Sequence, residues 1–213
     1  MSHGKRGRRL TDKMRLGIFG GTFDPPHVGH LILATEAQYR LKLERVLWVL
    51  TPYPPHKAGQ SISPVDERFE LLSASLAGNP DFELSRIDLD RSPPHYAVDT
   101  VELLHKTYPA AQLVYLMGGD SLGDLPNWHA PQAFVRACDE IGVMQRPGRE
   151  YDLPDLEVRL PGLTERVRFI DAPLLEISSS QLRRRMAEGE ACRYYFLPSV
   201  YELIQERGLY RNP

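Results

Sequence analysis

Residues 16–30 read LGIFGGTFDPPHVGH, and this stretch decides the fold. A short apolar run, Leu16–Phe19, leads into the glycine pair Gly20-Gly21, and an amphipathic segment begins at His27. An apolar strand, a glycine-rich turn and a helix in direct succession are typical of the first βα unit of a parallel sheet. Glycine lets backbone amides come close to a phosphate, and the N-terminus of the following helix adds a partial positive charge. The stretch therefore predicts a phosphate site at the end of the first strand.

Short apolar runs and longer amphipathic runs alternate along the rest of the chain. We expect strands at Leu16–Phe19, Val46–Leu50, Phe82–Ile87, Leu113–Met117, Glu140–Met144 and Val167–Ile170. We expect helices at His27–Leu41, Val65–Ala77, Val98–Lys106, Pro131–Ala137, Ser180–Glu188 and Ser199–Glu206. Ser63-Pro64 signals a helix start with proline at the first helical position, and Gly78, Gly189 and Gly208 signal helix ends. The predicted fold class is α/β: a Rossmann-like, doubly wound parallel sheet with a short C-terminal helical portion.

The chain has 213 residues, which is enough for one hydrophobic core and few for two full domains. We expect a basic, disordered tail at residues 1–14 and a single domain over 15–213, whose C-terminal helical portion spans 177–213. The proline-containing stretch Arg146–Pro161 is predicted as a linker between the body of the sheet and the C-terminal portion.

Charge and composition exclude several classes of protein. The formal net charge is −2, whereas a dedicated nucleic-acid binder is clearly basic. The first 15 residues have six basic side chains against Asp12, a local charge of +5 that leaves −7 for the remainder. Cys138 and Cys192 stand far apart, which argues against a disulfide scaffold and a thiolate zinc site. No apolar run approaches the roughly 18 residues of a membrane helix, so we expect a soluble, cytoplasmic protein without a membrane partner.

His27 and His30 are three residues apart at the start of the first predicted helix. Their rings therefore lie on one face and can converge on one phosphate group. A zinc site is the rival use of such a pair, but H-x-x-H without an acidic or cysteine third ligand nearby is a weak zinc signal. Neither G-x-G-x-x-G nor G-x-x-x-x-G-K-[ST] occurs in the chain, which disfavours a dinucleotide-binding dehydrogenase and a P-loop hydrolase.

Three proline pairs, at 25–26, 54–55 and 93–94, are each followed at once by a histidine. The loops beyond the carboxyl ends of parallel strands form the ligand crevice of such a sheet. Three rigid loops could each bring an imidazole to that crevice, although Pro-Pro-His can equally mark an ordinary turn.

Two segments resemble the signatures of the nucleotidylyltransferase superfamily. GGTFDPPHVGH resembles the H-x-G-H signature, and Ile177–Arg183 resembles the second one, usually I-S-S-T-x-x-R, with Ser180 in place of threonine. Four further segments are similar to motifs of bacterial nicotinate-nucleotide adenylyltransferases: Pro54–Lys57, His95–Thr100, Gly118–Trp128 and Arg193–Tyr201. Ala97 and His129 depart from the usual residues of that family. The resemblance covers nearly everything from Arg15 to Arg211.

The resemblance implies adenylyl transfer from ATP to nicotinate mononucleotide, which yields deamido-NAD and pyrophosphate in NAD biosynthesis. A phosphate monoester has a second pKa near 6, so the attacking phosphate is already ionised at neutral pH and needs no general base. The site has to position two polyanions and stabilise charge on the α-phosphoryl group. Mg²⁺ is expected as the cofactor, bound with ATP and not held by protein side chains.

The resemblance also implies the site residues. The catalytic set is His27, His30, Lys57 and Arg183. The ATP-binding set is Gly20, Gly21, Thr22, Phe23, His27, His30, Asp120, Ile177, Ser178, Ser179, Ser180 and Arg183. The set for nicotinate mononucleotide is Thr22, Lys57, Tyr96, Ala97, Thr100, Asp120, Trp128 and His129. Asp24 is expected to shape the loop, and the whole site to be a small positive crevice in an acidic body.

Three alternatives stay open at this point. The same chemistry could act on nicotinamide mononucleotide, phosphopantetheine or, with CTP, an alcohol phosphate. A Rossmann-type dehydrogenase would need the missing glycine fingerprint. A non-enzymatic nucleic-acid-binding module would use the basic residues of the first 14 positions. The sequence leaves the oligomeric state open.

Overall fold

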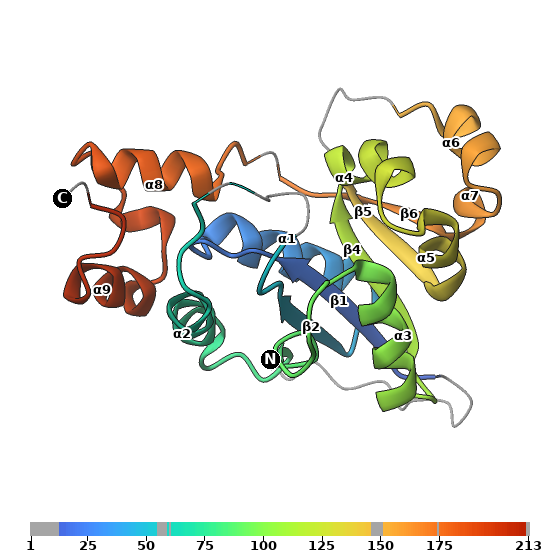
Figure 1. The fold of residues 1–213 in the computed structure, drawn as a ribbon, viewed down its shortest axis with the longest axis horizontal. Coiled ribbons are helices and arrows are strands. Elements are labelled where there is room, and N and C mark those ends of the chain that lie inside the picture. The colour runs from blue at the N-terminus through green and yellow to red at the C-terminus, as the bar shows by residue number, and fades with distance from the viewer. Residues whose placement is uncertain (1–12, 55–58, 60, 146–150, 174, 212–213) are drawn as a thin grey trace, which may run out of the picture.

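The computed structural model describes residues 13–54, 59, 61–145, 151–173 and 175–211. Within these ranges, six parallel strands form one sheet in the order β3-β2-β1-β4-β5-β6 (Figure 1). The strands are β1 Arg15–Gly21, β2 Arg45–Leu50, β3 Phe82–Ser85, β4 Gln112–Gly118, β5 Glu140–Gln145 and β6 Val167–Asp171. This is the strand order of the doubly wound Rossmann fold, which confirms the predicted fold class.

Helices cover both faces of the sheet. The longer ones are α1 Val28–Leu41, α2 Val65–Leu76, α3 Ala97–Thr107, α8 Ser179–Ala187 and α9 Pro198–Glu206. The shorter ones are α4 Gly119–Asp124, α5 Pro131–Ala137, α6 Leu153–Arg159 and α7 Leu163–Arg166, with 3₁₀ turns η2 Leu125–Asn127 and η3 Arg193–Tyr195. One core lies between the sheet and α3, α5, α6 and α7, and a second lies between the other face and α1 and α2. Two separate apolar cores on one sheet explain why its strands are apolar on both sides.

All six predicted strands and all six predicted helices are confirmed, with ends shifted by one or two residues. The glycine stop signals are also confirmed: Gly78, Gly189 and Gly208 have φ of 85°, 74° and 63° and follow the ends of α2, α8 and α9. Helix α2 starts at Val65 as predicted, but its N-cap is Pro64, so the interpretation of Ser63 as the cap and Pro64 as the first helical residue is wrong.

The prediction of a linker at Arg146–Pro161 is wrong over its second half, where α6 forms; residues 146–150 lie outside the described ranges. Asp152 starts this helix, since its side chain accepts a hydrogen bond from the backbone N–H of Asp155 at 3.0 Å. Leu156 and Leu160 are buried against the sheet. Proline near the start of a helix is compatible with it, so Pro154 is no obstacle to α6.

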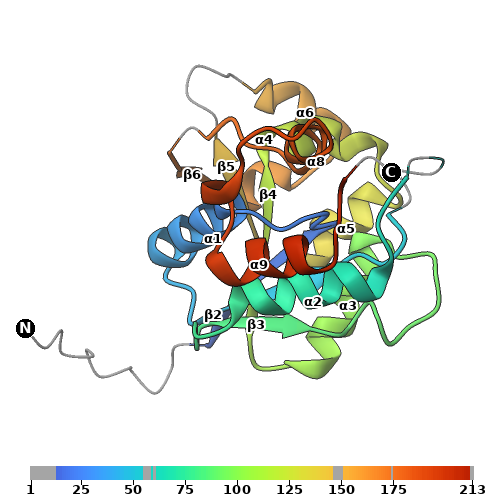
Figure 2. The same cartoon turned by 90° about the vertical axis from the view of Figure 1, so that its left-hand side faces the viewer.

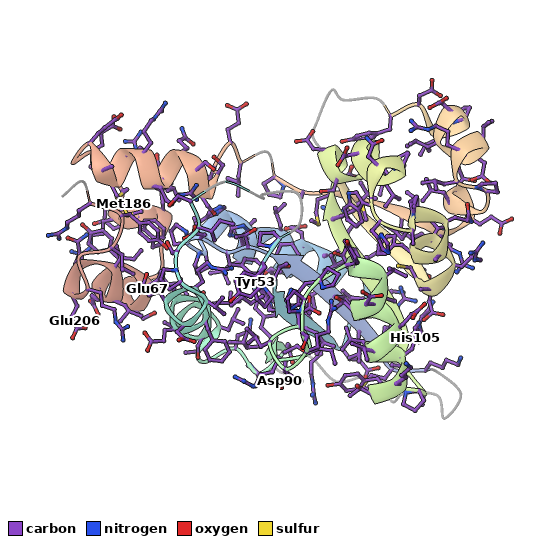
Figure 3. The ribbon with its side chains drawn as sticks, in the orientation of Figure 1. Tyr53, Glu67, Asp90, His105, Met186 and Glu206 are labelled. Carbon is purple, nitrogen blue, oxygen red and sulfur yellow. The ribbon has the colours of Figure 1, made fainter. Side chains whose placement is uncertain are left out.

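A third apolar cluster joins the C-terminal helices to α2. It contains Leu71 of α2, Leu182 and Met186 of α8, and Val200 and Ile204 of α9. Figure 2 shows α9 alongside α2, and Figure 3 shows Met186 between α8 and α9. The helices of the predicted C-terminal portion therefore pack on the body through α2. The boundaries 15–213 and 177–213 stay predictions.

The sheet brings two glycine pairs together at one edge. Gly20-Gly21 ends β1 and Gly118-Gly119 joins β4 to α4, and β1 and β4 are neighbours. From β1 the chain continues to β2 on one side, and from β4 it continues to β5 on the other side. The gap between the carboxyl ends of β1 and β4 is therefore the topological switch point of the sheet. Open α/β sheets bind their ligands at such a point.

Candidate active site

His27 and His30 lie together at the end of the loop that follows β1. His27 is the N-cap of α1 and His30 is its third residue. Their rings stack with centroids 3.7 Å apart and planes 27° apart. The prediction that both rings lie on one face is confirmed.

The surroundings of the two rings determine their protonation. Burial lowers the pKa of His27 to about 4, so this imidazole is neutral at pH 7. Its Nδ1 is buried without a hydrogen-bond partner in the described part of the chain. The backbone N–H of His27 donates to Nδ1 of His30 at 3.2 Å. A neutral His30 ring therefore carries its proton on Nε2.

The second signature docks directly onto the first. The Ser179 hydroxyl donates to the carbonyl of Pro25 at 2.9 Å, and Nη1 of Arg183 donates to the carbonyl of Asp24 at 2.6 Å. A Cβ added to Gly29 would lie 3.0 Å from His27 Nδ1 and 3.7 Å from Ile177 Cβ. The two signatures, which are far apart in the sequence, thus place the N-termini of α1 and α8 next to each other.

The serines that begin α8 differ in their contacts. Ser178 is the N-cap, and its Oγ accepts from the backbone N–H of Gln181 at 3.2 Å. Ser179 is tied to Pro25, as described above. Ser180 is exposed, and its Oγ accepts from Nη2 of Arg183 at 3.4 Å. Ser178 and Ser180 are exposed, whereas Ser179 and Arg183 are partly buried.

Two predicted ATP-binding residues, Thr22 and Phe23, are held by contacts within the protein. Phe23 is buried, packs against Gly21 and His30, and has a left-handed φ of 46°. The Thr22 carbonyl accepts from Nη1 of Arg68 at 3.0 Å. Phe23 therefore offers a ligand only its backbone.

A cleft of about 760 Å³ opens at the carboxyl end of β1, where Gly20 lines it; His27 and His30 are not among its lining residues. Its lining includes Tyr96, Ala97, Thr100, Asp120, Trp128 and His129 of the predicted mononucleotide set, together with Gly20 of the ATP set. The sheet thus brings these residues together from the ends of β1, β4 and the start of α3. Thr22 does not line this cleft, and Lys57 lies outside the described residues.

Aromatic rings form the walls of the cleft. Tyr96 and His129 stack with centroids 3.9 Å apart and planes 17° apart. Trp128 packs on Phe134 at 5.3 Å and meets the edge of Tyr115 at 6.2 Å. Stacked and edge-on pairs of this kind hold their rings in fixed orientations, so the cleft has rigid, flat walls.

A buried polar network supports the start of α3. The Thr100 hydroxyl donates to Asp88 at 2.8 Å, and Nε of Arg91 donates to the same carboxylate at 2.9 Å. Arg91 also donates to the carbonyls of Pro94 and Tyr96. Thr100 is thus engaged within the protein, although it lines the cleft. His95, from the third Pro-Pro-His segment, is buried there too, whereas His56 lies outside the described residues.

Sequence reasoning missed Arg68, which is 1% exposed in α2. It donates to four backbone carbonyls, those of Thr22, Thr51, Pro52 and Ser63. Burial lowers the pKa of its guanidinium, partly offset by the charge of Asp24. The only signal in the sequence is its spacing, because Arg68 occupies a position on the apolar stripe of α2 with Leu71, Leu72 and Leu76.

His27, His30 and Arg183, which we expect to form a positive crevice, are not among the residues that line the cleft, and Lys57 lies outside the described residues, so this expectation stays a prediction. The lining of the cleft contains Asp88, Asp120 and Asp124 and, among the described residues, neither lysine nor arginine. Asp88 is neutralised by Arg91. Positive charge is concentrated instead at Arg183, beside the histidine pair.

Among the described residues, no group of three or more His, Cys, Asp or Glu side chains is placed to hold a metal ion. Cys138 and Cys192 are both buried and free, and burial raises the pKa of each thiol. None of the helices in the described ranges combines the length and apolar character needed to cross a bilayer.

The strand order, the histidine pair after β1 and the docked second signature define a Rossmann-like nucleotidyltransferase. In agreement, the family model described as cytidylyltransferase-like matches residues 18–185. A probable nicotinate-nucleotide adenylyltransferase of Thermomicrobium roseum is 47% identical over 93% of this chain and 92% of its own length. One from Roseiflexus sp. is 41% identical over 92% of this chain and 98% of its own length. The chain belongs to the nicotinate-nucleotide adenylyltransferase family of cytidylyltransferase-like proteins.

Solved structures agree on the fold. The Plasmodium falciparum nicotinic acid mononucleotide adenylyltransferase complexed with NaAD is similar with a TM-score of 0.75, at 18% identity, over 92% of this chain and 97% of that one. The same Plasmodium enzyme complexed with APC gives a TM-score of 0.74 over 93% of this chain and 98% of that one.

Proposed function

We propose that this chain transfers the adenylyl group of ATP to nicotinate mononucleotide, forming nicotinate adenine dinucleotide and pyrophosphate in NAD biosynthesis. One observation carries the proposal. The second signature is docked through Ser179 and Arg183 on the loop that continues from Gly20-Gly21, and Gly20 also lines a flat-walled cleft. A site for a triphosphate and a site for an aromatic nucleotide are thereby adjacent, and relatives at up to 47% identity are named for this activity.

In the reaction an oxygen of the mononucleotide's 5′-phosphate attacks the α-phosphorus of ATP. The bond from the α-phosphorus to the bridging oxygen breaks, and pyrophosphate leaves with that oxygen. The attacking phosphate is largely ionised at neutral pH, so no proton has to be removed. The protein's contribution is alignment of the two phosphates and stabilisation of the developing charge.

The histidine pair is suited to the phosphates of ATP. His27 is neutral at pH 7, and a neutral His30 ring carries its proton on Nε2, so that both can act as hydrogen-bond donors. We assign His30 to the α-phosphoryl group, where charge develops in the transition state.

The N-terminus of α8 is suited to the β- and γ-phosphates. Its first backbone amides have no acceptor within the helix, and the helix dipole favours an anion there. The Ser179 hydroxyl donates to the carbonyl of Pro25, so Ser179 offers the phosphates its backbone amide. Ser178 and Ser180 offer hydroxyl groups from the same turn. Arg183 and Lys57 complete the assigned set as fixed positive charges.

The cleft is suited to the mononucleotide. Tyr96, Trp128 and His129 provide flat rings for a pyridine ring to stack on. Ala97 is the first residue of α3, so backbone amides at this helix N-terminus can receive the pyridine carboxylate. Asp120 and Asp124 are acceptors for ribose hydroxyl groups. An acidic lining is therefore compatible with this ligand.

Mg²⁺ fits this site as a companion of the triphosphate. The donor set supports this assignment, because magnesium usually keeps several waters and takes few protein carboxylates beside substrate phosphates. When bound, the ion neutralises charge on the phosphates that leave as pyrophosphate.

The test is product identification. The purified protein is incubated with Mg²⁺, ATP and nicotinate mononucleotide, and pyrophosphate and the dinucleotide are quantified together. We expect both products in equal amounts, with none of the dinucleotide when the mononucleotide is omitted. Pyrophosphate release without a dinucleotide, or no turnover at all, would refute the proposal.

A further inference from the structure

A tyrosine from far along the chain reaches the loop that carries the histidine pair. The hydroxyl of Tyr210, which follows α9, donates to Oδ1 of Asp24 at 2.9 Å, although the two residues are 186 positions apart. Asp24 is 3% exposed, so this carboxylate is inside the protein. The Ser63 side chain also hydrogen-bonds to Tyr210.

Asp24 connects Tyr210 to the groups assigned to ATP. Its Oδ2 accepts from the backbone N–H of Ser63 at 3.2 Å and lies 3.8 Å from Nη1 of Arg183. The same Nη1 donates to the carbonyl of Asp24. Asp24 is three residues before His27. A change in the position of Asp24 would therefore move a phosphate-binding arginine and a histidine together.

The backbone is strained at Tyr210 and at Phe23, the residue before Asp24. Phe23 and Tyr210 have left-handed φ values of 46° and 60°, a conformation that residues other than glycine rarely adopt. Such conformations persist where surrounding contacts hold them. The Tyr210–Asp24 hydrogen bond is a contact that spans both strained segments.

Tyr210 is itself fixed by the C-terminal helices. Gly208, with φ of 63°, turns the chain back at the end of α9. Helix α9 is anchored on α2 by the ion pair of Arg207 with Glu70 and by the Ser199 hydroxyl, which donates to the carbonyl of Ala74. Burial and the neighbouring carboxylate of Asp24 raise the pKa of Tyr210, so its hydroxyl stays protonated and donates at every physiological pH.

We propose that Tyr210 is a positioning residue for ATP: its hydrogen bond to the buried carboxylate of Asp24 holds Arg183 and the loop of His27 in the geometry that binds the triphosphate. The proposal rests on the proposed function only in taking ATP as the ligand of this loop. Tyr210 belongs to neither signature, so the proposal gives the segment after α9 a new part in nucleotide binding.

Tyr210→Phe tests it, because this change removes the hydroxyl and keeps the ring. Tyr108→Phe is the matched control, since the Tyr108 hydroxyl also donates to a carboxylate, that of Glu83, at 3.3 Å near the beginning of β3, away from the site. Binding of MgATP alone is measured by calorimetry, together with KM for nicotinate mononucleotide and the melting temperature.

We expect the Kd of MgATP to rise about tenfold in Tyr210→Phe, the usual size for losing a hydrogen bond to a charged group. The KM for nicotinate mononucleotide stays within about twofold in that variant, and every constant stays within about twofold in Tyr108→Phe. An unchanged Kd for MgATP in Tyr210→Phe overturns the proposal, as does an equal loss for both substrates, which indicates a general structural defect.

Two further measurements keep the test decisive. If Tyr210→Phe is poorly folded, amide exchange of the wild-type protein replaces it: the coupling is reciprocal, so MgATP must slow exchange at residues 208–211. Unchanged exchange there overturns the proposal.

Wild-type protein that binds MgATP but makes no dinucleotide refutes the proposed function alone, because the comparison of MgATP affinities is still valid.

Discussion

His30 shows how one backbone contact prepares a side chain for a chemical role. The N–H of His27 occupies Nδ1 of His30, which places the proton of a neutral ring on Nε2. A donor fixed in this way needs no reorganisation when charge develops on a phosphoryl group. The role assigned to His30 follows from that orientation and not from a positive charge.

Replacing His30 by alanine should lower kcat by more than tenfold, a loss of at least ~1.4 kcal/mol of transition-state stabilisation. Steady-state kinetics of pyrophosphate release provide the measurement. His105→Ala is the control, because His105 lies in the last turn of α3, away from the C-terminal helices (Figure 3). Retention of more than about a tenth of wild-type kcat in His30→Ala would remove His30 from its central role.

His27 makes stability depend on pH. Its pKa is about 4 in the folded protein and 6.5 in the unfolded chain, so between these values the unfolded chain takes up a proton that the folded protein does not. The contribution is complete above pH 6.5 and is lost as pH falls toward 4. The free energy of unfolding should therefore decrease by up to about 3 kcal/mol over this window on account of His27.

Urea unfolding of the wild type and His27→Asn, at about pH 7 and about pH 4.5, measures this dependence. The variant should lose less stability than the wild type on acidification. Identical losses in the two proteins would show that His27 is not kept neutral by burial.

The elements with the clearest periodic patterns were predictable. The six strands are short apolar runs, and α2, α8 and α9 are followed by glycines with a left-handed φ. Helices α4, α6 and α7, of four to seven residues, were missed, although α5, which also has seven, was predicted; a segment this short gives a period of 3.6 little room to show. The same limit explains why Arg146–Pro161 was interpreted as a linker.

The candidate site was predictable where motif residues lie next to one another in sequence. His27 with His30, and Ser180 with Arg183, meet within one helical turn. Arg68 and Tyr210 were not predictable, because their partners are backbone carbonyls and a buried carboxylate brought near only by the packing of α2 and α9. A single polar residue in an amphipathic pattern does not indicate which loop it supports.

Helix α2 holds the loops after β1 and β2 through Arg68, so Arg68→Met should be strongly destabilising. The substitution leaves four backbone carbonyls without their donor, and we expect a loss of about 3 kcal/mol or more in the free energy of unfolding. Urea unfolding measures it. Arg86→Met serves as the control, since its ion pair with Asp90 is exposed and contributes about 1 kcal/mol or less. Similar losses in the two variants would contradict the role of Arg68.

At the scale of the whole molecule, the sites that we propose for the two substrates lie at different parts of one sheet edge. The histidine pair and α8 lie beside β1, and the cleft extends toward β4 and α3. The described lining residues include no lysine or arginine that could pair with the carboxylate of nicotinate. We therefore assign this carboxylate to the backbone amides at the start of α3. If backbone amides recognise the carboxylate, as we propose, Ala97 can stand in place of the family's usual residue.

The preference between two acceptor substrates tests the central claim most directly. The values of kcat/KM are compared for nicotinate mononucleotide and nicotinamide mononucleotide, with saturating MgATP and one preparation of the protein. Helix amides that receive a carboxylate should favour the nicotinate form by at least about 100-fold. Equal values, or a preference for the nicotinamide form, would contradict the assignment of this protein to nicotinate mononucleotide.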